Sequence, residues 1–285
     1  MSAALPLHWH RTTLDGQVAV YGDAGEGPPL VFVHGWGLHS RTYARALPHL
    51  ASRGVRVLAP ALPGFGRSDP LPGEYTWRAL AGWMDDLLDH AGIDEPADFV
   101  GHSFGGGVSV ATAWYHPERV RSIVLVNSIG GSVWKERGTG ERHLHERPLW
   151  DWGLRLPREW TRRSYRRVLP VVVRDLVGNA LRNPQAVWRA ADLARSADLR
   201  DELEALAARG LPITVLWGDQ DRVVPRATFL ATCDAAGAAG DIVEGGAHSW
   251  LLADPAGFGE VVTNSLAVHR MAVEAGERTG GGSAA

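Results

Sequence analysis

Short apolar runs recur along the chain, and segments with helical spacing separate them. The run at 123–126, Ile-Val-Leu-Val, is apolar at every position rather than at alternate positions, which is typical of strands that are covered on both faces. In the intervening segments, apolar residues recur every three to four positions. This alternation predicts an α/β fold, with a mostly parallel sheet, helical crossovers and helices on both faces.

The same pattern gives approximate bounds for each element. Strands are expected at residues 17–21, 30–33, 55–59, 98–100, 122–126, 213–217 and 241–243. Helices are expected at residues 42–53, 77–91, 104–115, 227–236 and 255–273.

The alternation stops between residues 128 and 210. This stretch has no convincing strand but several amphipathic pieces rich in Arg, Leu and Trp. We therefore expect a helical cap at 128–210, inserted into an α/β core made of residues 1–127 and 211–274. The tail, 275–285, is small, polar and glycine-rich, and it is expected to be disordered because it can bury too little apolar surface to offset its ordering entropy.

The composition narrows the class of protein. The chain has 285 residues, 45% hydrophobic and 21% charged, with a formal net charge of -3, so a nucleic-acid partner is not expected. Its single cysteine, Cys233, cannot form an internal disulfide and fits a reducing compartment. No export signal and no run of 18 apolar residues is present, which predicts a cytoplasmic protein without a membrane span.

The segment Gly101-His102-Ser103-Phe104-Gly105 matches Gly-x-Ser-x-Gly, although with 34 glycines in the chain the match alone has little weight. Its context supports it: an expected strand precedes the motif and an expected helix follows it, which is the setting of a nucleophile elbow. Small neighbours let such a tight turn close while the serine hydroxyl points into the cleft. Ser103 is therefore the predicted nucleophile.

A serine hydroxyl needs a base, and His248 is the predicted one because it lies in a small-residue loop after the last expected strand. His269 falls in the final helix and is expected at the surface. The acid that orients the base is expected at the end of the strand at 213–217, where Asp219 and Asp221 both stand. We choose Asp221 for its reach, with Asp219 as the alternative. The end of the preceding strand carries no anion.

A tetrahedral intermediate needs N–H donors for its oxyanion. The amide of Phe104, directly after the nucleophile, is one predicted donor, and the amide of Trp36, in the loop after the strand at 30–33, is the other. His34 precedes that loop, and we expect it to brace the loop by a hydrogen bond rather than to act as a second base.

Taken together, these motifs resemble the α/β-hydrolase superfamily over roughly residues 15–270. The resemblance implies an eight-stranded sheet, the order Ser, Asp, His along the chain, and an inserted cap; a serine at 103 sets aside the members that use an aspartate nucleophile. The segments at 34–38 and 62–68 are also similar to those of the pimeloyl-ester carboxylesterase of biotin synthesis and related esterases. The matching segments are His34-Gly35-Trp36-Gly37, Leu62-Pro63-Gly64-Phe65-Gly66-Arg67-Ser68, 101–106, His116-Pro117-Glu118-Arg119-Val120 and the loops of Asp221 and His248.

The expected cap is basic, with 16 Lys and Arg against 11 Asp and Glu. A solvated helix face is the favoured reading, and recruitment of an anionic substrate or a lipid surface is the alternative. Five of the twelve tryptophans also fall there, and Trp134 and Trp160 are expected to line an apolar substrate pocket. No carboxylate or cysteine frames His143 and His145 at ligand spacing, so no metal is expected.

The predicted activity is hydrolysis of small to medium carboxylic esters through an acyl-enzyme on Ser103, with no cofactor. The expected partner is a small ester with an apolar group, and the oligomeric state stays open. Hydrolysis of a carbon–carbon bond in a vinylogous diketone, or perhydrolysis, could use the same triad. A binding module without catalysis is the alternative from a different class.

Overall fold

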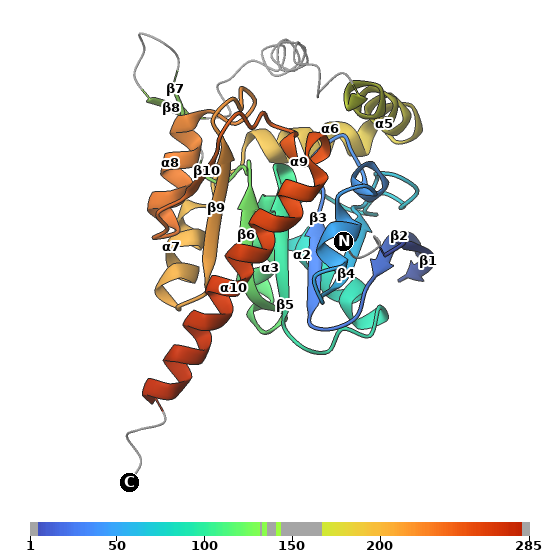
Figure 1. Ribbon diagram of the computed structural model, residues 1–285. Coiled ribbons are helices and arrows are strands. Elements are labelled where there is room, and N and C mark those ends of the chain that lie inside the picture. The colour runs from blue at the N-terminus through green and yellow to red at the C-terminus, as the bar shows by residue number, and fades with distance from the viewer. Residues whose placement is uncertain (1–4, 132, 136–140, 144–166, 281–285) are drawn as a thin grey trace.

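The computed structural model describes residues 5–131, 133–135, 141–143 and 167–280 (Figure 1). The strands are β1 (His8–Leu14), β2 (Gln17–Ala24), β3 (Pro29–Val33), β4 (Arg56–Ala61), β5 (Ala97–His102), β6 (Val120–Val126), β7 (Val133–Lys135), β8 (Glu141–His143), β9 (Ile213–Gly218) and β10 (Asp241–Val243). The helices are α1 (Leu47–Ala51), α2 (Trp77–His90), α3 (Phe104–Tyr115), α5 (Leu169–Arg182), α6 (Pro184–Arg195), α7 (Arg200–Ala208), α8 (Arg226–Ala235), α9 (Trp250–Ala253) and α10 (Pro255–Gly280), with short 3-10 helices at Ser40–Tyr43 and Pro117–Arg119.

Eight strands form one sheet in the order β1-β2-β4-β3-β5-β6-β9-β10. The pairs β1–β2 and β2–β4 are antiparallel. The pairs β4–β3, β3–β5, β5–β6, β6–β9 and β9–β10 are parallel. The predicted fold class, a mostly parallel eight-stranded α/β-hydrolase sheet, is therefore confirmed.

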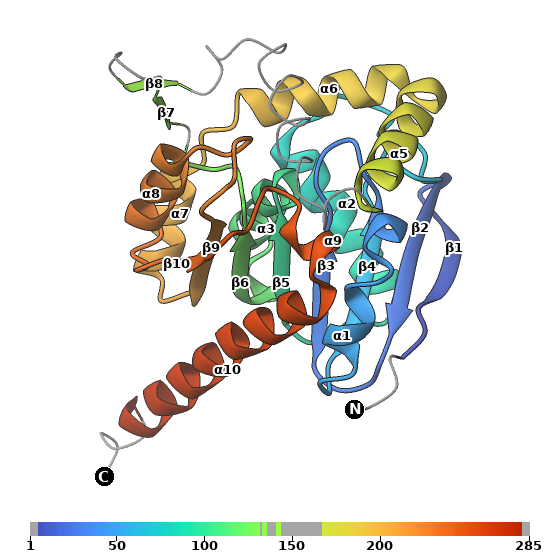
Figure 2. The same cartoon turned by 45° about the horizontal axis from the view of Figure 1, so that its top comes forward.

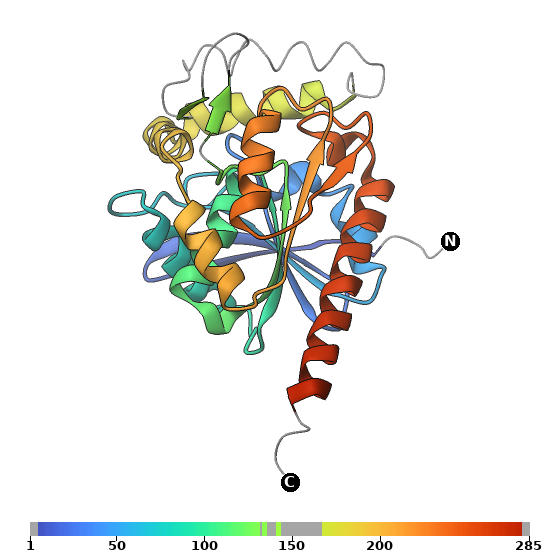
Figure 3. The same cartoon turned by 90° about the vertical axis from the view of Figure 1, so that its left-hand side faces the viewer.

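Helices cover both faces of the sheet, with α1, α9 and α10 on one side and α2, α3, α7 and α8 on the other (Figure 3). The strand residues divide between the two layers by alternation. In β6, Ile123 and Leu125 belong to the cluster under α2, α3, α7 and α8, whereas Val124 and Val126 belong to the cluster under α1, α9 and α10. Burial on both faces explains why the central strands are apolar at every position.

Two helices, α5 and α6, lie across one end of the sheet, above the loops that follow the parallel strands (Figure 2). Both helices lie within the bounds of the predicted cap. Helix α7 packs against α3 and α8, with Leu203 and Leu206 buried in the cluster under these helices. The chain therefore returns to the sheet layer near Leu199, somewhat before residue 210.

Several elements differ from the expectation. Strand β1 was not predicted because it is an edge strand whose residues are mostly exposed, so it carries no apolar run. Strands β7 and β8 form a separate two-stranded sheet within the predicted cap, and three residues each are too few for a visible pattern. Ser40–Tyr43 and α1 replace the single helix expected at 42–53.

The predictions for the C-terminal segment are also corrected. Helix α10 continues to Gly280, past residue 274, where disorder was expected, because Ala, Glu and Arg in this segment have high helix propensity. His269 is buried rather than at the surface, with its Nε2 2.7 Å from the Thr214 hydroxyl oxygen. Among the described residues, no helix combines the length and apolarity needed to cross a bilayer.

Candidate active site

Ser103 lies on a sharp turn between β5 and α3. Its backbone angles, φ 54° and ψ -117°, fall in a region that costs a non-glycine residue free energy. Gly101 lets the turn close, because a Cβ at that position would lie 2.6 Å from the carbonyl oxygen of Gly105 and from the backbone nitrogen of Gly106. The strand-turn-helix context predicted for Ser103 is therefore present, and it holds the serine above the carboxyl end of the sheet.

Three side chains predicted to act together lie in one hydrogen-bonded row. The His248 Nε2 atom is 3.1 Å from Ser103 Oγ, and its Nδ1 atom is 2.8 Å from Asp221 Oδ2. Because a carboxylate only accepts hydrogen bonds, the ring proton resides on Nδ1, so Nε2 is the unprotonated nitrogen that can accept the serine proton. All three side chains are buried.

Four donors converge on the Asp221 carboxylate. Oδ1 accepts the amides of Val223 and Val224 at 2.7 and 2.9 Å, and Oδ2 accepts Asn127 Nδ2 at 2.5 Å in addition to His248. Asn127 is itself held by the Trp250 indole, which donates to its Oδ1 at 3.0 Å. Asp219, the alternative acid, is exposed. The structure thus places Asp221 beside the base, together with an asparagine whose role the sequence did not reveal.

The loop after β3 holds the peptide that carries the Trp36 amide. His34 Nε2 accepts the Leu62 amide at 2.9 Å, so its Nδ1 carries the proton and donates to the Gly35 carbonyl at 2.9 Å. In a trans peptide the C=O and the next N–H point in opposite directions, so anchoring Gly35 C=O aims the Trp36 N–H the other way. His34 therefore braces the loop, as predicted. Phe104 opens α3, and the first N–H groups of a helix lack an intrahelical acceptor.

A second buried histidine links three loops of the site. His102 Nε2 donates to the carbonyl of His248 at 2.9 Å, and its Nδ1 accepts the Tyr43 hydroxyl at 2.8 Å. The Tyr43 oxygen in turn accepts the Gly35 amide at 3.3 Å. Burial lowers the pKa of both His34 and His102 to about 3. Both rings are therefore neutral near pH 7 and act as fixed hydrogen-bonding groups.

These two histidines should make the fold sensitive to acid. An unfolded histidine takes up a proton near pH 6.5, whereas the folded rings stay neutral until about pH 3. The unfolded state binds more protons in that window, so the free energy of unfolding should fall as pH drops below about 6.5, by roughly 1 kcal/mol per pH unit for each histidine. Urea unfolding at pH 7 and pH 5 should show a smaller pH effect in His102→Gln than in wild type. An equal reduction in the exposed control His8→Gln would count against this account.

A cavity of about 430 Å³ opens beside Ser103 and His248, within the range typical of small-molecule sites. Its walls are mostly aliphatic and aromatic, and they come from the core loops and from α5 and α6. Arg195 on α6 is the charged member of the wall. The lining residues are Trp36, Leu38, His102, Ser103, Phe104, Ile129, Val172, Leu176, Ala180, Val187, Trp188, Ala191, Ala194, Arg195, Val223, His248 and Ser249.

The two tryptophans predicted for the pocket are not tested by this geometry. Trp160 lies outside the described residues, and Trp134 lies in β7, where only the backbone is described. The described tryptophans in the cavity wall are Trp36 and Trp188. The Trp36 indole donates to the Val187 carbonyl at 2.9 Å, which ties the loop after β3 to α6. Of the basic side chains of the expected cap, Arg155, Arg158, Arg162, Arg163 and Arg166 also lie outside the described residues.

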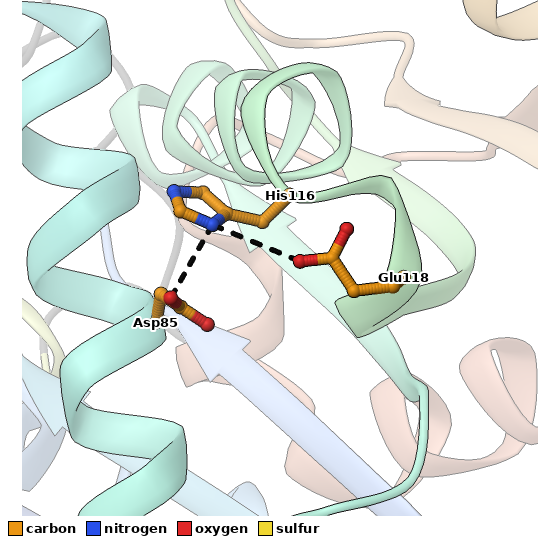
Figure 4. A group of neighbouring side chains, drawn as sticks. All are labelled: Asp85, His116 and Glu118. Carbon is orange, nitrogen blue, oxygen red and sulfur yellow. Dashed lines mark ion pairs between the residues drawn. The ribbon is translucent and has the colours of Figure 1, made fainter.

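A cluster away from the cavity has the residue types of a metal site (Figure 4). The ligand atoms of Asp85, His116 and Glu118 lie within 4.8 Å of one another. However, Asp85 accepts Arg119 Nε at 2.6 Å with one oxygen and lies 3.3 Å from His116 Nδ1 with the other. A guanidinium already neutralises this carboxylate, so the cluster is an ion-pair network that ties α2 to the end of α3.

The lone cysteine lies outside the site. Cys233 is buried in α8, and burial raises its thiol pKa to about 11. It is therefore a packing residue rather than a nucleophile at neutral pH.

Comparison with known proteins decides the family. The model of the alpha/beta hydrolase family matches residues 30–261. The chain belongs to this family. Among the relatives of this hydrolase is a Mycobacterium phage D29 protein, provisionally named a non-heme haloperoxidase, which is 32% identical over 85% of this chain and 88% of its own length. The pimeloyl-[acyl-carrier protein] methyl ester esterase of Aeromonas hydrophila is 28% identical over 84% and 95%, respectively.

A third relative is similar over a shorter region. The 2-hydroxymuconate semialdehyde hydrolase of Pseudomonas sp. is 41% identical over 114 residues, which are 39% of this chain and 40% of that protein. This hydrolase therefore has relatives named as an esterase, a haloperoxidase and a semialdehyde hydrolase, and the family alone leaves its substrate open.

Proposed function

We propose that this protein hydrolyses carboxylic esters with a small to medium apolar acyl group through an acyl-enzyme on Ser103. The observation that carries the proposal is the row Asp221–His248–Ser103, which ends at a mostly apolar cavity. No cofactor is needed for this chemistry, because a base, a nucleophile and N–H donors suffice.

In the proposed mechanism, Ser103 Oγ attacks the ester carbonyl while its proton passes to His248 Nε2. The developing oxyanion accepts hydrogen bonds from the backbone N–H groups of Trp36 and Phe104, which are already oriented before the substrate binds. Collapse of the intermediate expels the alcohol, which takes the proton from His248. A water then repeats the sequence on the acyl-enzyme, releasing the acid and restoring Ser103. Asp221 keeps the proton of His248 on Nδ1 and stabilises the imidazolium.

The cavity wall suggests which part of the ester it holds. Val172, Leu176 and Ala180 from α5 and Ala191 from α6 offer only alkyl groups, so they can contact an acyl chain but cannot hydrogen-bond a polar one. Each additional buried methylene should contribute about 0.8 kcal/mol until the cavity is filled. Catalytic efficiency should therefore rise with chain length from acetate and then level off.

The proposal can be tested with p-nitrophenyl esters from acetate to dodecanoate. We expect kcat/KM to rise by about fourfold per methylene over the first members, following the transfer free energy. In Ala191→Phe the rise should end at a shorter chain, with acetate turnover close to wild type. Failure to hydrolyse any ester, or equal efficiency for all of them, would contradict the proposal. Ser103 should also react with a fluorophosphonate, which a non-catalytic binding module would not do.

One feature favours a second candidate, hydrolysis of a carbon–carbon bond in a vinylogous diketone. Arg195 lines the cavity and could pair with a substrate carboxylate, and the partial relative from Pseudomonas is named a 2-hydroxymuconate semialdehyde hydrolase. Its guanidinium is 3.6 Å from Asp192 in the same helix, an exposed pair that a substrate could displace. Ester and diketone substrates assayed together with Arg195→Gln distinguish the two, because the substitution should impair only the anionic diketone.

The relative from phage D29 suggests perhydrolysis as a side reaction of the same acyl-enzyme, with hydrogen peroxide in place of water as the acceptor. Peroxide-dependent halogenation of an indicator dye would reveal it, and Ser103→Ala should abolish it.

A further inference from the structure

Helix α5 faces the core with a row of polar side chains. Asp175, Asn179 and Asn183 follow one another at intervals of four residues, which places them on one face of the helix and its end. Their side chains bond to two core loops: the loop after β3 and the loop after β4. Asp175 accepts the Thr42 hydroxyl at 2.6 Å, and Asn183 Nδ2 donates to the Gly64 carbonyl at 3.1 Å.

Asn179 lies at the centre of this row and bridges both loops. It is 2% exposed. Its Nδ2 donates to the carbonyl of Gly37 at 2.9 Å and to that of Leu38 at 3.4 Å, and its Oδ1 accepts the amide of Gly66 at 2.9 Å. The loop approaches α5 closely here, because a Cβ on Gly37 would lie 2.7 Å from Leu176 Cδ1. Asn179 does not line the cavity, so these bonds serve the protein and not the substrate.

Two peptide groups connect Asn179 to the predicted oxyanion donor. The Gly37 carbonyl that it holds belongs to the same planar unit as the Leu38 amide. That amide donates to the Gly35 carbonyl at 3.3 Å, and Gly35 C=O shares its own planar unit with the Trp36 N–H. Fixing the first plane therefore helps to fix the second, in addition to the hydrogen bond that the His34 ring donates to the same Gly35 carbonyl.

We propose that Asn179 is a positioning residue that orients the Trp36 N–H, so that docking of α5 on the core and completion of the oxyanion hole are one event. The inference rests on the proposed function of this site. It assigns to a residue of the cap helix an effect on the transition state, where the negative oxygen develops, rather than on binding of the ground-state ester.

The test is Asn179→Asp, which keeps the acceptor for Gly66 but removes both donations to the loop after β3. We expect kcat for p-nitrophenyl butyrate to fall roughly ten- to a hundredfold, less than for outright loss of an oxyanion donor, with KM within about threefold of wild type. Affinity for an alkyl trifluoromethyl ketone should fall by the same factor as kcat/KM, because its adduct with Ser103 carries the oxyanion. Asn179→Ser, which introduces no charge, provides the same comparison if Asn179→Asp does not fold.

Asn183→Asp is the matched control, since it makes the same chemical change one turn later at a bond to the loop after β4. It should retain near wild-type kcat and ketone affinity. Equal losses in the Asn179 and Asn183 variants, or a fall in kcat at position 179 with unchanged ketone affinity, would overturn the proposal. If wild type itself hydrolyses no ester and Ser103 does not react with a fluorophosphonate, the proposed function has failed instead.

Discussion

Replacement of Ser103 by alanine should lower kcat for p-nitrophenyl acetate and butyrate by about 10⁵-fold or more, the scale seen when a triad nucleophile is removed. The reason is chemical: without Oγ no acyl-enzyme can form, and His248 has no proton to accept from the protein. Labelling by a fluorophosphonate should disappear at the same time. Steady-state assays and intact-protein mass spectrometry measure the two effects.

The control for this prediction is Ser109→Ala. Ser109 is buried in α3, the helix that follows Ser103, and its hydroxyl donates to the Gly105 carbonyl at 2.8 Å. Ser109→Ala therefore removes a hydroxyl group, as Ser103→Ala does, but at a residue that does not line the cavity. We expect it to retain both activity and labelling. Ser103→Ala with appreciable residual turnover would refute the assignment of the nucleophile.

The substitution Ser103→Gly tests whether the backbone at this turn is strained. The φ of 54° at Ser103 is costly for a residue with a Cβ but accessible to glycine. Ser103→Gly should therefore be as inactive as Ser103→Ala but no less stable, with an unfolding free energy equal to or about 1 kcal/mol above that of the alanine variant. Such a result would show that the backbone conformation that positions the Ser103 hydroxyl has a cost in stability.

The sequence was sufficient to predict the sheet where burial on both faces makes a strand uniformly apolar, as at 123–126. It was insufficient at β1, where an exposed edge leaves a polar strand such as His8–Leu14. The residues of the predicted triad could be identified from the sequence for a related reason. Each follows a strand that the apolar pattern reveals, and the carboxyl ends of parallel strands meet at one edge of the sheet.

The residues that hold this site in place could not be found in the same way. Asn127 and Asp221 are 94 residues apart, and Asn179 is 142 residues from Gly37; no local periodicity links such pairs. Asn127, at the end of the strand that carries no anion, instead donates a hydrogen bond to the acid. One signal was available at α5, since polar residues at 175, 179 and 183 interrupt an apolar segment at helical spacing. His269 was expected at the surface from its polarity, but it is buried with its Nε2 beside the Thr214 hydroxyl, 55 residues away in sequence.

The second large effect is expected at Asp221, where asparagine should lower kcat by about 10³- to 10⁴-fold. The four donors around the carboxylate explain why an isosteric amide cannot replace it. If the new NH₂ group faces Val223 and Val224, it meets two backbone N–H donors. If it faces His248, it must donate to Nδ1; the ring proton then moves to Nε2, and His248 can no longer accept the proton of Ser103.

Asp219→Asn is the matched control for this substitution, because it makes the same change two residues away at the exposed carboxylate that was the alternative acid. It should leave kcat near wild type, while Asp221→Asn retains KM and reacts slowly with the fluorophosphonate. Loss of activity in the Asp219 variant with an active Asp221 variant would transfer the role of the acid to Asp219. The kcat of Asn127→Leu should lie between those of the Asp221 and Asp219 variants. This substitution removes one of the four donors to Asp221 but leaves the carboxylate itself beside His248.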